Sequence, residues 1–334
     1  MTENRPRANL SKIKKILAIR NDKIGDLILS SNVITLLRRQ FPTAKIDIVV
    51  SEENKPLIEE NKSINKIYVL KYSPRTIKEF LNYFNLSKKI RAERYDIGVD
   101  LRGSFFNIFF LLFLGGVKYN IGFYTNKLSK LFLDYAHLKD FKGHASNNMV
   151  EMMNEGLRIN SKNLWPEIAV SKHDIKEIKK FIKENKISKS ISLCVDSSHK
   201  LKQWPLDRFD EIIKYLHKNY PAYKILLLSI DKNKIYYLIK KNPFCIPLLN
   251  QNLRFIFLLF KMNKLVIAPD GGMMHLAWVS KTNLIAFIPP SIALEHFEQI
   301  KPLGKNAKII FKELKNIKTD EIKNLIDKIL IIKK

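Results

Sequence analysis

Short apolar runs alternate with helical patterns along most of this chain, beginning near residue 15. Runs of this kind, separated by segments of helical periodicity, are typical of α/β proteins whose parallel strands are buried on both faces. The alternation predicts strands at 15–20, 45–50, 66–70, 96–100, 190–195, 223–229, 264–268 and 283–288. It predicts helices near 27–40, 54–61, 75–92, 104–114, 205–219, 232–241, 252–262 and 272–280.

The alternation is interrupted between about residues 124 and 188, where the pattern predicts two helices, around 145–158 and 172–185. A chain of 334 residues is long enough for two domains of ordinary size. Two α/β series joined by a helical stretch therefore predict two Rossmann-like domains that face each other across a cleft. We place the first domain at 1–170 and the second at 171–334. We also considered a C-terminal helix that packs back on the first domain.

The chain carries a large positive charge. Its 59 lysine and arginine residues outnumber 32 acidic residues, which gives a formal net charge of +27, and the excess is spread along the chain rather than gathered in one arm. Such a field favours anionic partners, which include nucleic acid, an acidic lipid surface and a phosphorylated substrate. Charge does not choose among them, because lysine, isoleucine and asparagine are all abundant and part of the basicity also fits a genome-wide compositional bias.

Several features bear on the compartment. The two cysteines, Cys194 and Cys245, each lie in an apolar run, which predicts buried thiols in a reducing compartment rather than disulfides. The N-terminal stretch MTENRPRANLSKIKK has no apolar segment of the length that a secretory signal needs. The most apolar segment, 105–116, is shorter than the roughly 20 residues that span a bilayer. We interpret it as a buried helix in preference to an interfacial membrane contact.

In open parallel sheets, ligands bind beyond the carboxyl ends of the strands, so the loops there are candidate sites. The first such loop, NDKIG, follows the strand at 15–20. Gly25 allows a sharp backbone turn close to a ligand, and Asp26 stands at the start of the helix. From this loop alone, a helix-capping Asp26 and a ligand-facing Asp26 both stay open, while Asp22 is expected to be a solvated loop acid.

The second loop, DSSHKLKQWPLDRF, covers residues 196–209. Ser197 and Ser198 offer hydroxyl donors, and Lys200 and Lys202 offer ammonium groups, so the loop has the donors that a phosphate requires. The alternative interpretation is a solvated basic turn with Trp204 as a core anchor.

The third loop lies in APDGGMMHLAWVS, residues 268–280. Gly271 and Gly272 expose backbone N–H groups at the start of a helix whose dipole adds partial positive charge, which together favour a diphosphate. Asp270 and His275 flank this turn. The loop lacks the full GxGxxG fingerprint, and a single histidine near a helix start is also typical of a packed or capping residue.

Several common catalytic signatures are absent from the sequence. It contains no Walker A motif, no HExxH, no CxxC, no GxSxG and no DxD. This favours a metal-free mechanism, in which the basic loop and the helix start replace a divalent cation.

Four segments in one order resemble the heptosyltransferases of lipopolysaccharide core synthesis, glycosyltransferase family 9. They are ILAIRNDKIGDLILSSNVITLLRRQFP, YDIGVDLRGSFFN, LKQWPLDRF and PDGGMMHLAWVSKTNLIAFIPPS. The helix NQNLRFIFLLF that precedes the last segment also looks like the family's. Each segment alone is weak evidence, but four in order, spread over most of the chain, are specific.

The resemblance implies the GT-B fold, with two Rossmann-like domains and the active site between them. It implies an inverting glycosyltransferase that moves heptose from ADP-heptose to a sugar of the inner core, with no cofactor and no required metal. By matching position, Asp26 corresponds to the proposed general base and Gly25 to its neighbour near the donor sugar. The other donor-binding positions are Ser197, Ser198 and Lys202, which match the phosphate contacts, and Asp270, Gly271, Gly272 and His275, which match the loop for donor sugar and diphosphate.

The chain departs from the family pattern at two of these segments. Gly271 stands where the family usually has Ser or Thr, so a hydroxyl contact is missing there. Arg102 stands where the family often has Gln, which changes the acceptor side or merely adds a charge. For the family's acidic contact to the nucleoside, the candidate is Asp231.

The resemblance implies a nucleotide-sugar donor, an anionic lipid-linked oligosaccharide acceptor and a peripheral contact with the inner membrane. It places the protein in the cytoplasm and at the cytoplasmic face of that membrane, without a nucleic-acid partner. Two alternatives stay open. One is a GT-B enzyme that uses another nucleotide sugar or is a sugar-nucleotide epimerase. The other is a non-catalytic basic protein that binds nucleic acid or membrane, which the lack of an RNP-type or helix-turn-helix pattern disfavours.

Overall fold

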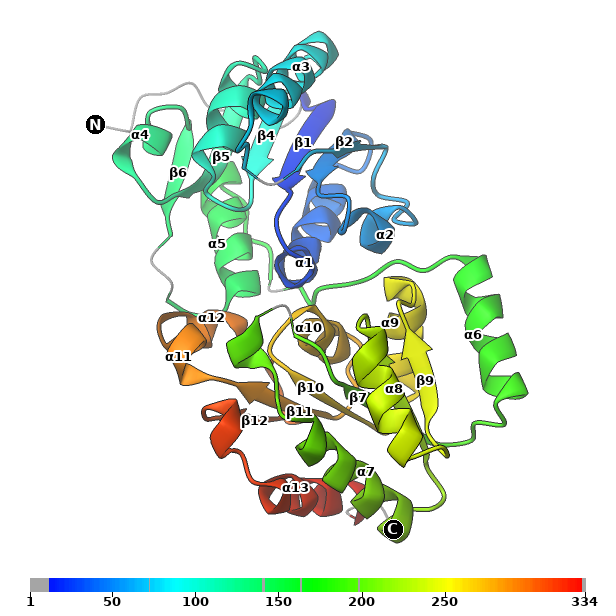
Figure 1. The fold of residues 1–334 in the computed structure, drawn as a ribbon. Helices are drawn as coiled ribbons and strands as arrows, with labels where there is room; N and C mark the ends of the chain where they lie inside the picture. Colours follow the sequence, from blue (N-terminus) through cyan, green and yellow to red (C-terminus); the bar gives the residue numbers. More distant parts are fainter. Residues whose placement is uncertain (1–11, 72, 140–141, 163, 198, 332–334) are drawn as a thin grey trace. The chain divides into compact units, whose positions relative to one another are not determined.

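The computed structural model describes residues 12–331, apart from residues 72, 140, 141, 163 and 198. The chain divides into two compact units, Met1–Ala169 and Val170–Lys334. Each unit contains one six-stranded sheet in which all neighbouring strands are parallel (Figure 1). The predicted α/β class is therefore confirmed.

The first sheet has the strand order β3-β2-β1-β4-β5-β6. Its strands are β1 (Lys15–Arg20), β2 (Lys45–Val50), β3 (Lys66–Val69), β4 (Ile97–Asp100), β5 (Tyr119–Tyr124) and β6 (Tyr135–Leu138). The chain order reverses between β1 and β4, and ligands bind at such switch points in doubly wound sheets. The register of this pair sets Ile19 opposite Asp100, so the chain segments that follow both strands leave the sheet side by side.

Helices cover both faces of the first sheet. They are α1 (Ile24–Gln40), α2 (Lys55–Ile58), α3 (Ile77–Glu93), the π-helical segment η2 (Asn107–Phe113), α4 (Lys127–Lys130) and α5 (Ala145–Leu157). On one face, Val33 of α1 and Met153 of α5 pack on Ile16. On the other face, residues of α3 and η2 pack on Leu17 and Ile19. Successive residues of β1 thus pack in cores on opposite faces of the sheet, as the alternation of side chains along a strand requires.

The second sheet has the order β12-β11-β10-β7-β8-β9. Its strands are β7 (Ser190–Cys194), β8 (Lys224–Ser229), β9 (Ile246–Leu249), β10 (Leu265–Pro269), β11 (Leu284–Ile288) and β12 (Ala307–Phe311). Its helices are α6 (Lys172–Glu184), η3 (Lys200–Lys202), α7 (Leu206–Asn219), α8 (Lys232–Lys241), α9 (Leu253–Met262), α10 (Gly272–Val279), α11 (Pro290–Ala293), η4 (Leu294–His296), α12 (Phe297–Ile300), η5 (Leu314–Asn316) and α13 (Thr319–Ile331). Trp204, which is buried, packs edge-on against Phe209 and at a tilt against Phe287, and so anchors the core, as one interpretation of its loop expected.

The last helix, α13, packs on α7 of the same unit. Ile322 and Ile326 are fully buried in the core of the second unit, and Tyr215 donates a hydrogen bond to Asp327 at 2.5 Å. The apolar face of α13 is therefore packed in the core of its own unit.

All eight predicted strands are present, and four further strands were missed. β5, with Asn120 and Gly122, and β9, with Pro247, contain residues that are depleted in strands. β6 falls in the stretch where we expected no strand, and only the neighbouring β5 supports its pairing. Tertiary pairing overrides weak local preference at these positions.

The apolar segment 105–116 is helical, but it is not wholly buried as predicted. Ile108, Leu111 and Leu112 are buried against the sheet, whereas 49% of Phe113 is exposed. Phe109 and Phe110, on the outer side of η2, are only partly buried. Within the described residues, no helix combines the length and the apolar character needed to cross a bilayer.

Candidate functional site

Arg20, the last residue of β1, holds two carboxylates in the first unit. Its guanidinium is buried, with Nε 3.0 Å from Asp22 Oδ1 and Nη2 3.1 Å from Asp26 Oδ1. Nη1 of the same group donates to the backbone oxygen of Leu101. A planar guanidinium with donors on several edges suits this three-way role, which a lysine ammonium would not reproduce.

Asp26 lies in the first turn of α1 and does not cap the helix. The helix begins at Ile24 after Lys23, whose side chain makes no capping bond, so the capping interpretation of Asp26 is wrong. The side chain of Asp26 is 40% exposed while Arg20 holds one of its oxygens. The carboxylate is thus oriented by the protein and open to a ligand. Gly25 also lies within the helix, so the sharp turn expected there does not exist.

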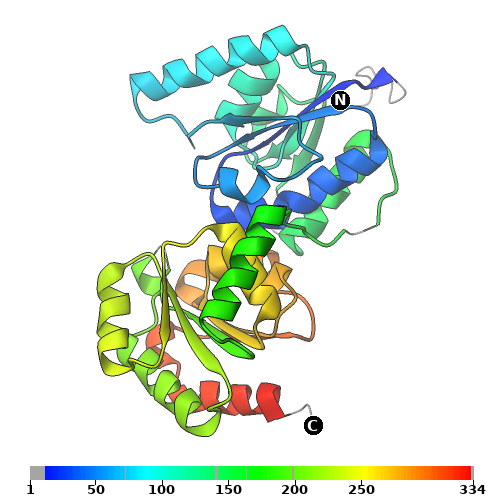
Figure 2. The ribbon, with the colours of Figure 1, turned by 90° about the vertical axis from the view of Figure 1, so that its right-hand side faces the viewer.

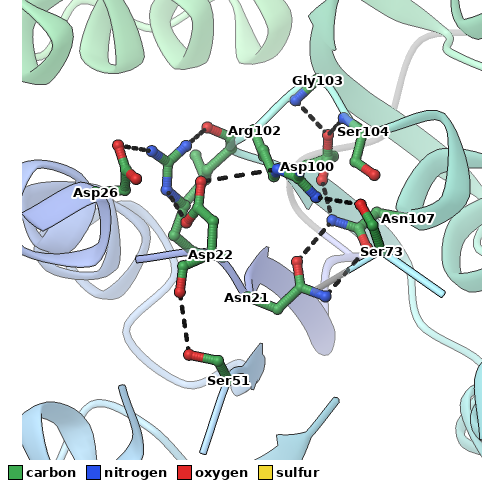
Figure 3. A network of polar contacts seen from close by, with 12 residues as sticks. Asn21, Asp22, Asp26, Ser51, Ser73, Asp100, Arg102, Gly103, Ser104 and Asn107 are labelled. Atoms are coloured by element: carbon green, nitrogen blue, oxygen red, sulfur yellow. Dashed lines mark hydrogen bonds and ion pairs between the residues drawn. The ribbon is translucent and has the colours of Figure 1, made fainter. Parts of the chain in front are cut away.

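Asp22 is not the solvated loop acid that we predicted. Its side chain is only 9% exposed and lies between Arg20 and Arg102, whose Nε is 3.8 Å from Asp22 Oδ2 (Figure 3). Burial raises the pKa of Asp22 to about 6, and the two arginines offset only part of that effect. The backbone oxygen of Asp22 accepts bonds from Ser51 and Asn54, which anchor the loop.

Asp100, at the end of β4, organises the neighbouring loop. Its fully buried carboxylate accepts bonds from the N–H groups of Gly103 and Ser104 at 2.6 and 2.9 Å and from Asn107 Nδ2 at 3.0 Å (Figure 3). Burial is the main influence on the pKa of Asp100 and raises it. Gly103 has a φ of +83°, a left-handed conformation that glycine adopts without strain. The carboxylate therefore fixes the turn that carries Arg102.

Sequence reasoning missed Arg20, Asp100 and Lys139 as members of this cluster. Lys139 Nζ donates to the backbone oxygen of Arg102 at 3.0 Å, and burial lowers the pKa of Lys139. A signal was present for the first two, because both are charged residues at the carboxyl ends of adjacent central strands. Lys139 follows a strand that local sequence did not reveal.

The second unit gathers several of the predicted donor-binding residues. Lys202 Nζ lies 2.5 Å from Asp270 Oδ2, and Ser197 Oγ donates to the backbone oxygen of Asp270 at 2.9 Å. Asp270 is buried, so Lys202 and Ser197 are tied to the end of β10. A lysine ammonium has three donors, so Lys202 can retain Asp270 and still bind an anion. Ser198 lies outside the described residues.

Helix α10 begins at Gly272, directly after the loop residue Gly271. No side chain caps this helix start, which leaves the first N–H groups available to a ligand. A Cβ on Gly271 would lie 3.8 Å from Ser197 Oγ, which places the helix start beside the Ser197 loop. His275 is buried in the first turn, where its N–H bonds to the backbone oxygen of Gly271. Backbone donors, a hydroxyl and an ammonium therefore surround one end of the second sheet.

A second polar cluster in this unit was not predicted. Asp196, next to the predicted Ser197, accepts a bond from the N–H of Ile230 at 2.6 Å and pairs with Lys234 at 3.0 Å. Ser229 donates to the same carboxylate at 2.5 Å. Asp231, our candidate for the nucleoside contact, caps α8 by accepting from the N–H of Asn233. Its carboxylate is thus already engaged locally.

Comparison with known proteins gives a consistent assignment. The family model described as glycosyltransferase family 9 (heptosyltransferase) matches residues 83–330. Lipopolysaccharide heptosyltransferase 3 of Escherichia coli is 37% identical over 78 residues, so the aligned part of the chain spans only 23% of that relative's length, and also 23% of this chain.

Solved structures extend the likeness to the whole fold. The structure of E. coli ADP-heptose lps heptosyltransferase II has a TM-score of 0.78 at 19% identity and covers 95% of this chain and 99% of its own. E. coli heptosyltransferase WaaC with ADP-2-deoxy-2-fluoro heptose has a TM-score of 0.75 at 16% identity, covering 94% and 99%. At these identities the likeness shows a shared GT-B fold. The match of the family model over most of the chain shows more: the chain belongs to glycosyltransferase family 9, the heptosyltransferase family.

Proposed function

We propose that this protein transfers heptose from ADP-heptose to a sugar of the lipopolysaccharide inner core, with inversion and without a metal ion. The observation that carries the proposal is the carboxylate of Asp26, half-exposed and held at 3.1 Å by the buried Arg20. Family membership supports an enzyme over a basic binding protein. The ADP-heptose named for one structural relative supports the choice of donor.

In the proposed reaction, a hydroxyl oxygen of the acceptor attacks the anomeric carbon of the heptose. A new C–O bond forms, the bond from the anomeric carbon to the diphosphate oxygen breaks, and ADP leaves with the bonding electrons. Asp26 takes the proton of the attacking hydroxyl. Arg20 holds this carboxylate in place, so its contribution, about 100-fold or more in rate, arises from positioning.

The second unit would stabilise the leaving diphosphate. Lys202 and the N–H groups at the start of α10 supply positive charge, and Ser197 supplies a hydroxyl near Gly271. Charge that develops on the leaving oxygen is best stabilised by donors that are already in place, because no reorganisation is needed as the bond breaks. Asp270 holds Lys202, and His275 fixes the first turn of α10. In this proposal Gly25 and Gly272 line the donor site, and Ser198 stays a donor-binding residue by its place in the sequence alone.

We further propose an anionic lipid-linked oligosaccharide as the acceptor and a peripheral location at the cytoplasmic face of the inner membrane. The excess of 27 positive charges supports an anionic acceptor. No nucleic-acid partner is needed to explain that charge.

The test mixes purified protein, ADP-heptose and a heptose-deficient acceptor lipid, with and without a chelator. We expect transfer in both conditions and an inverted anomeric configuration in the product. Asp26→Asn should lose about 100-fold or more in kcat. It should keep its fold, because the lost ion pair has a half-exposed partner and is worth at most about 1 kcal/mol.

The matched control is Asp320→Asn, which removes another exposed carboxylate from the first turn of a helix, paired there with Lys323. This variant should keep full activity. Full activity of Asp26→Asn would remove Asp26 from the mechanism, and a lack of transfer with every inner-core acceptor would refute the proposed reaction.

A second candidate is a GT-B enzyme with another nucleotide sugar or with epimerase chemistry. It is favoured by Gly271, which lacks the hydroxyl that the family pattern places in the donor loop. Calorimetric titration with a panel of nucleotide sugars distinguishes the two. Tightest binding of ADP-heptose supports the first proposal, and tighter binding of a different nucleotide sugar supports the second.

A further inference from the structure

Helix α3, cyan in Figure 2, lies on the outside of the first unit. It exposes a stripe of apolar side chains. Ile77, Leu81 and Phe84 are spaced by four and three residues, which places them on one face of a helix, and they are 82%, 54% and 44% exposed. The adjacent line of the helix is polar and carries Lys78, Asn82, Asn85 and Lys89. The buried side of α3 meets the core through Tyr83, Leu86 and Ile90. The apolar side chains of α3 thus extend around more of the helix than the side that packs on the core.

The stripe continues onto η2 through a series of contacts between aromatic rings. Phe80 of α3 lies 5.6 Å from Phe106 and 6.4 Å from Phe110, measured between ring centroids. Phe110 contacts Phe109, Phe109 stacks on Phe113, and Phe113 lies 4.8 Å from Phe132. Phe132 follows the exposed Leu128 and Leu131 along the chain. We call the surface made by Ile77, Phe80, Leu81, Phe84, Phe113 and Leu131 the aromatic face.

Positive charge surrounds the aromatic face. The segments that form it, residues 77–93, 104–118 and 125–132, contain seven basic and two acidic residues. Both acids already have partners, since Glu79 pairs with Lys71 and Glu93 with Lys15 and Lys66. Of the seven bases, Lys118 pairs with Asp96. Lys88 lies 4.5 Å from the centroid of the Phe84 ring, so basic and aromatic groups are interleaved.

A chain of side-chain contacts connects Phe80 of the aromatic face with the polar cluster that holds Asp26. Phe106 packs on Tyr83, and the hydroxyl of Tyr83 accepts a bond from Asn21 Nδ2 at 3.2 Å. Asn21 directly follows Arg20 in the chain.

We propose that the aromatic face docks the protein on an anionic phospholipid bilayer, with the apolar side chains in the interfacial region and the lysines at the headgroups. An exposed apolar stripe rimmed by lysines is the pattern of a helix that lies in a membrane interface. A second copy of this chain is a poorer occupant, because a symmetric interface would bring the same lysines together. The inference rests on the proposed function only in assuming that the acceptor is membrane-anchored.

The first experiment measures binding of the full chain to vesicles by flotation. Vesicles of phosphatidylcholine alone are compared with vesicles that also contain phosphatidylglycerol. We expect binding to the anionic vesicles, and a loss of about tenfold or more in the triple variant Ile77→Ser/Leu81→Ser/Phe84→Ser, which keeps every charge. The control Tyr236→Ser/Met262→Ser/Ile331→Ser removes exposed apolar side chains from the second unit and should bind as the natural protein does.

A second experiment reports insertion at a single position. Cys194 and Cys245 are both buried, so a cysteine placed at an exposed site takes up an environment-sensitive fluorophore selectively. The label on Leu81→Cys should shift to shorter wavelength when anionic vesicles are added. The same label on Tyr236→Cys should not shift.

Three results would overturn the proposal: no binding of the natural chain to anionic vesicles, undiminished binding of the Ile77/Leu81/Phe84 variant, or a dimer that this variant converts to a monomer without any vesicle binding. Transfer to a deacylated, water-soluble acceptor should be equal in all these variants. If vesicle binding behaves as expected but no acceptor is glycosylated, the docking surface stands and the proposed function fails.

Discussion

Arg20 Nε lies 3.0 Å from Asp22 Oδ1, inside the first unit and away from water. The same guanidinium reaches Asp26 with its Nη2. One buried cation therefore connects a buried carboxylate to an exposed one. Arg20 and Asp22 therefore position the proposed base, Asp26, from its buried side, and neither of them needs to contact a ligand.

This relationship predicts that Arg20→Lys lowers kcat while leaving the KM for ADP-heptose unchanged. Lysine keeps the charge but cannot hold Asp22, Asp26 and the Leu101 oxygen at once, so Asp26 loses its orientation. We expect a loss of about tenfold or more in kcat. Steady-state kinetics provide the measurement. Arg102→Lys is the comparison, because Arg102 approaches Asp22 from the other side, at 3.8 Å. A change in KM with unchanged kcat at Arg20→Lys would contradict the positioning role.

The buried Asp22 predicts a pH-dependent stability. Its pKa is about 6 in the folded protein and 3.8 for the free side chain, so the folded state binds the proton more tightly. The stability that this carboxyl contributes is complete below about pH 4 and is lost as the pH rises through about 6. Relative to Asp22→Asn, the natural protein should lose about 3 kcal/mol between these limits. Urea unfolding of both proteins across this range measures the difference. A constant difference would show that Asp22 titrates normally.

Removing Lys202 should weaken donor binding and also destabilise the fold. Lys202→Met leaves the buried Asp270 without its cation, which costs about 3–5 kcal/mol. The double variant Lys202→Met/Asp270→Asn removes both charges and should recover much of that stability. Both variants should bind ADP about 10-fold to 100-fold more weakly, because the phosphate loses a charged donor. Titration calorimetry and thermal unfolding separate the two effects. Normal ADP affinity in the stable double variant would exclude Lys202 from the donor site.

Gly271 offers a test of the missing hydroxyl. Its φ of +157° and ψ of −172° suit glycine, so both Gly271→Ser and Gly271→Ala should cost about 1–2 kcal/mol of stability. Space is not limiting, because a Cβ would lie 3.8 Å from Ser197 Oγ. Both variants carry the same cost of backbone strain. The difference between their affinities for the donor therefore measures the contribution of the hydroxyl. We expect the serine variant to bind ADP-heptose a few-fold, about threefold to tenfold, more tightly than the alanine variant. Equal affinities would mean that no donor atom lies within reach.

Whether the role of a site residue was predicted correctly depended on how far that role is set by residues nearby in the sequence. Gly271 and Gly272 were placed correctly at a helix start, because a strand followed by two glycines and an apolar helix is a local pattern. The capping role considered for Asp26 was wrong, because α1 begins earlier, at Ile24. Asp22 was misjudged because its burial depends on Arg102, which is 80 positions away in the chain.

The sequence by itself determined the α/β class, the positions of the central strands and the loops that follow them. These features depend on hydrophobic periodicity, which any short window of the chain displays. Only the tertiary structure decided which charges meet. Parallel pairing of β1 with β4 brings residues 20–26 beside residues 100–107, and burial there raises the pKa of Asp22. The tertiary structure also decided that one side of η2 packs in the core, while the phenylalanines on the other side stay partly exposed. Periodicity is local, whereas desolvation and ion pairing depend on every segment that packs around a group.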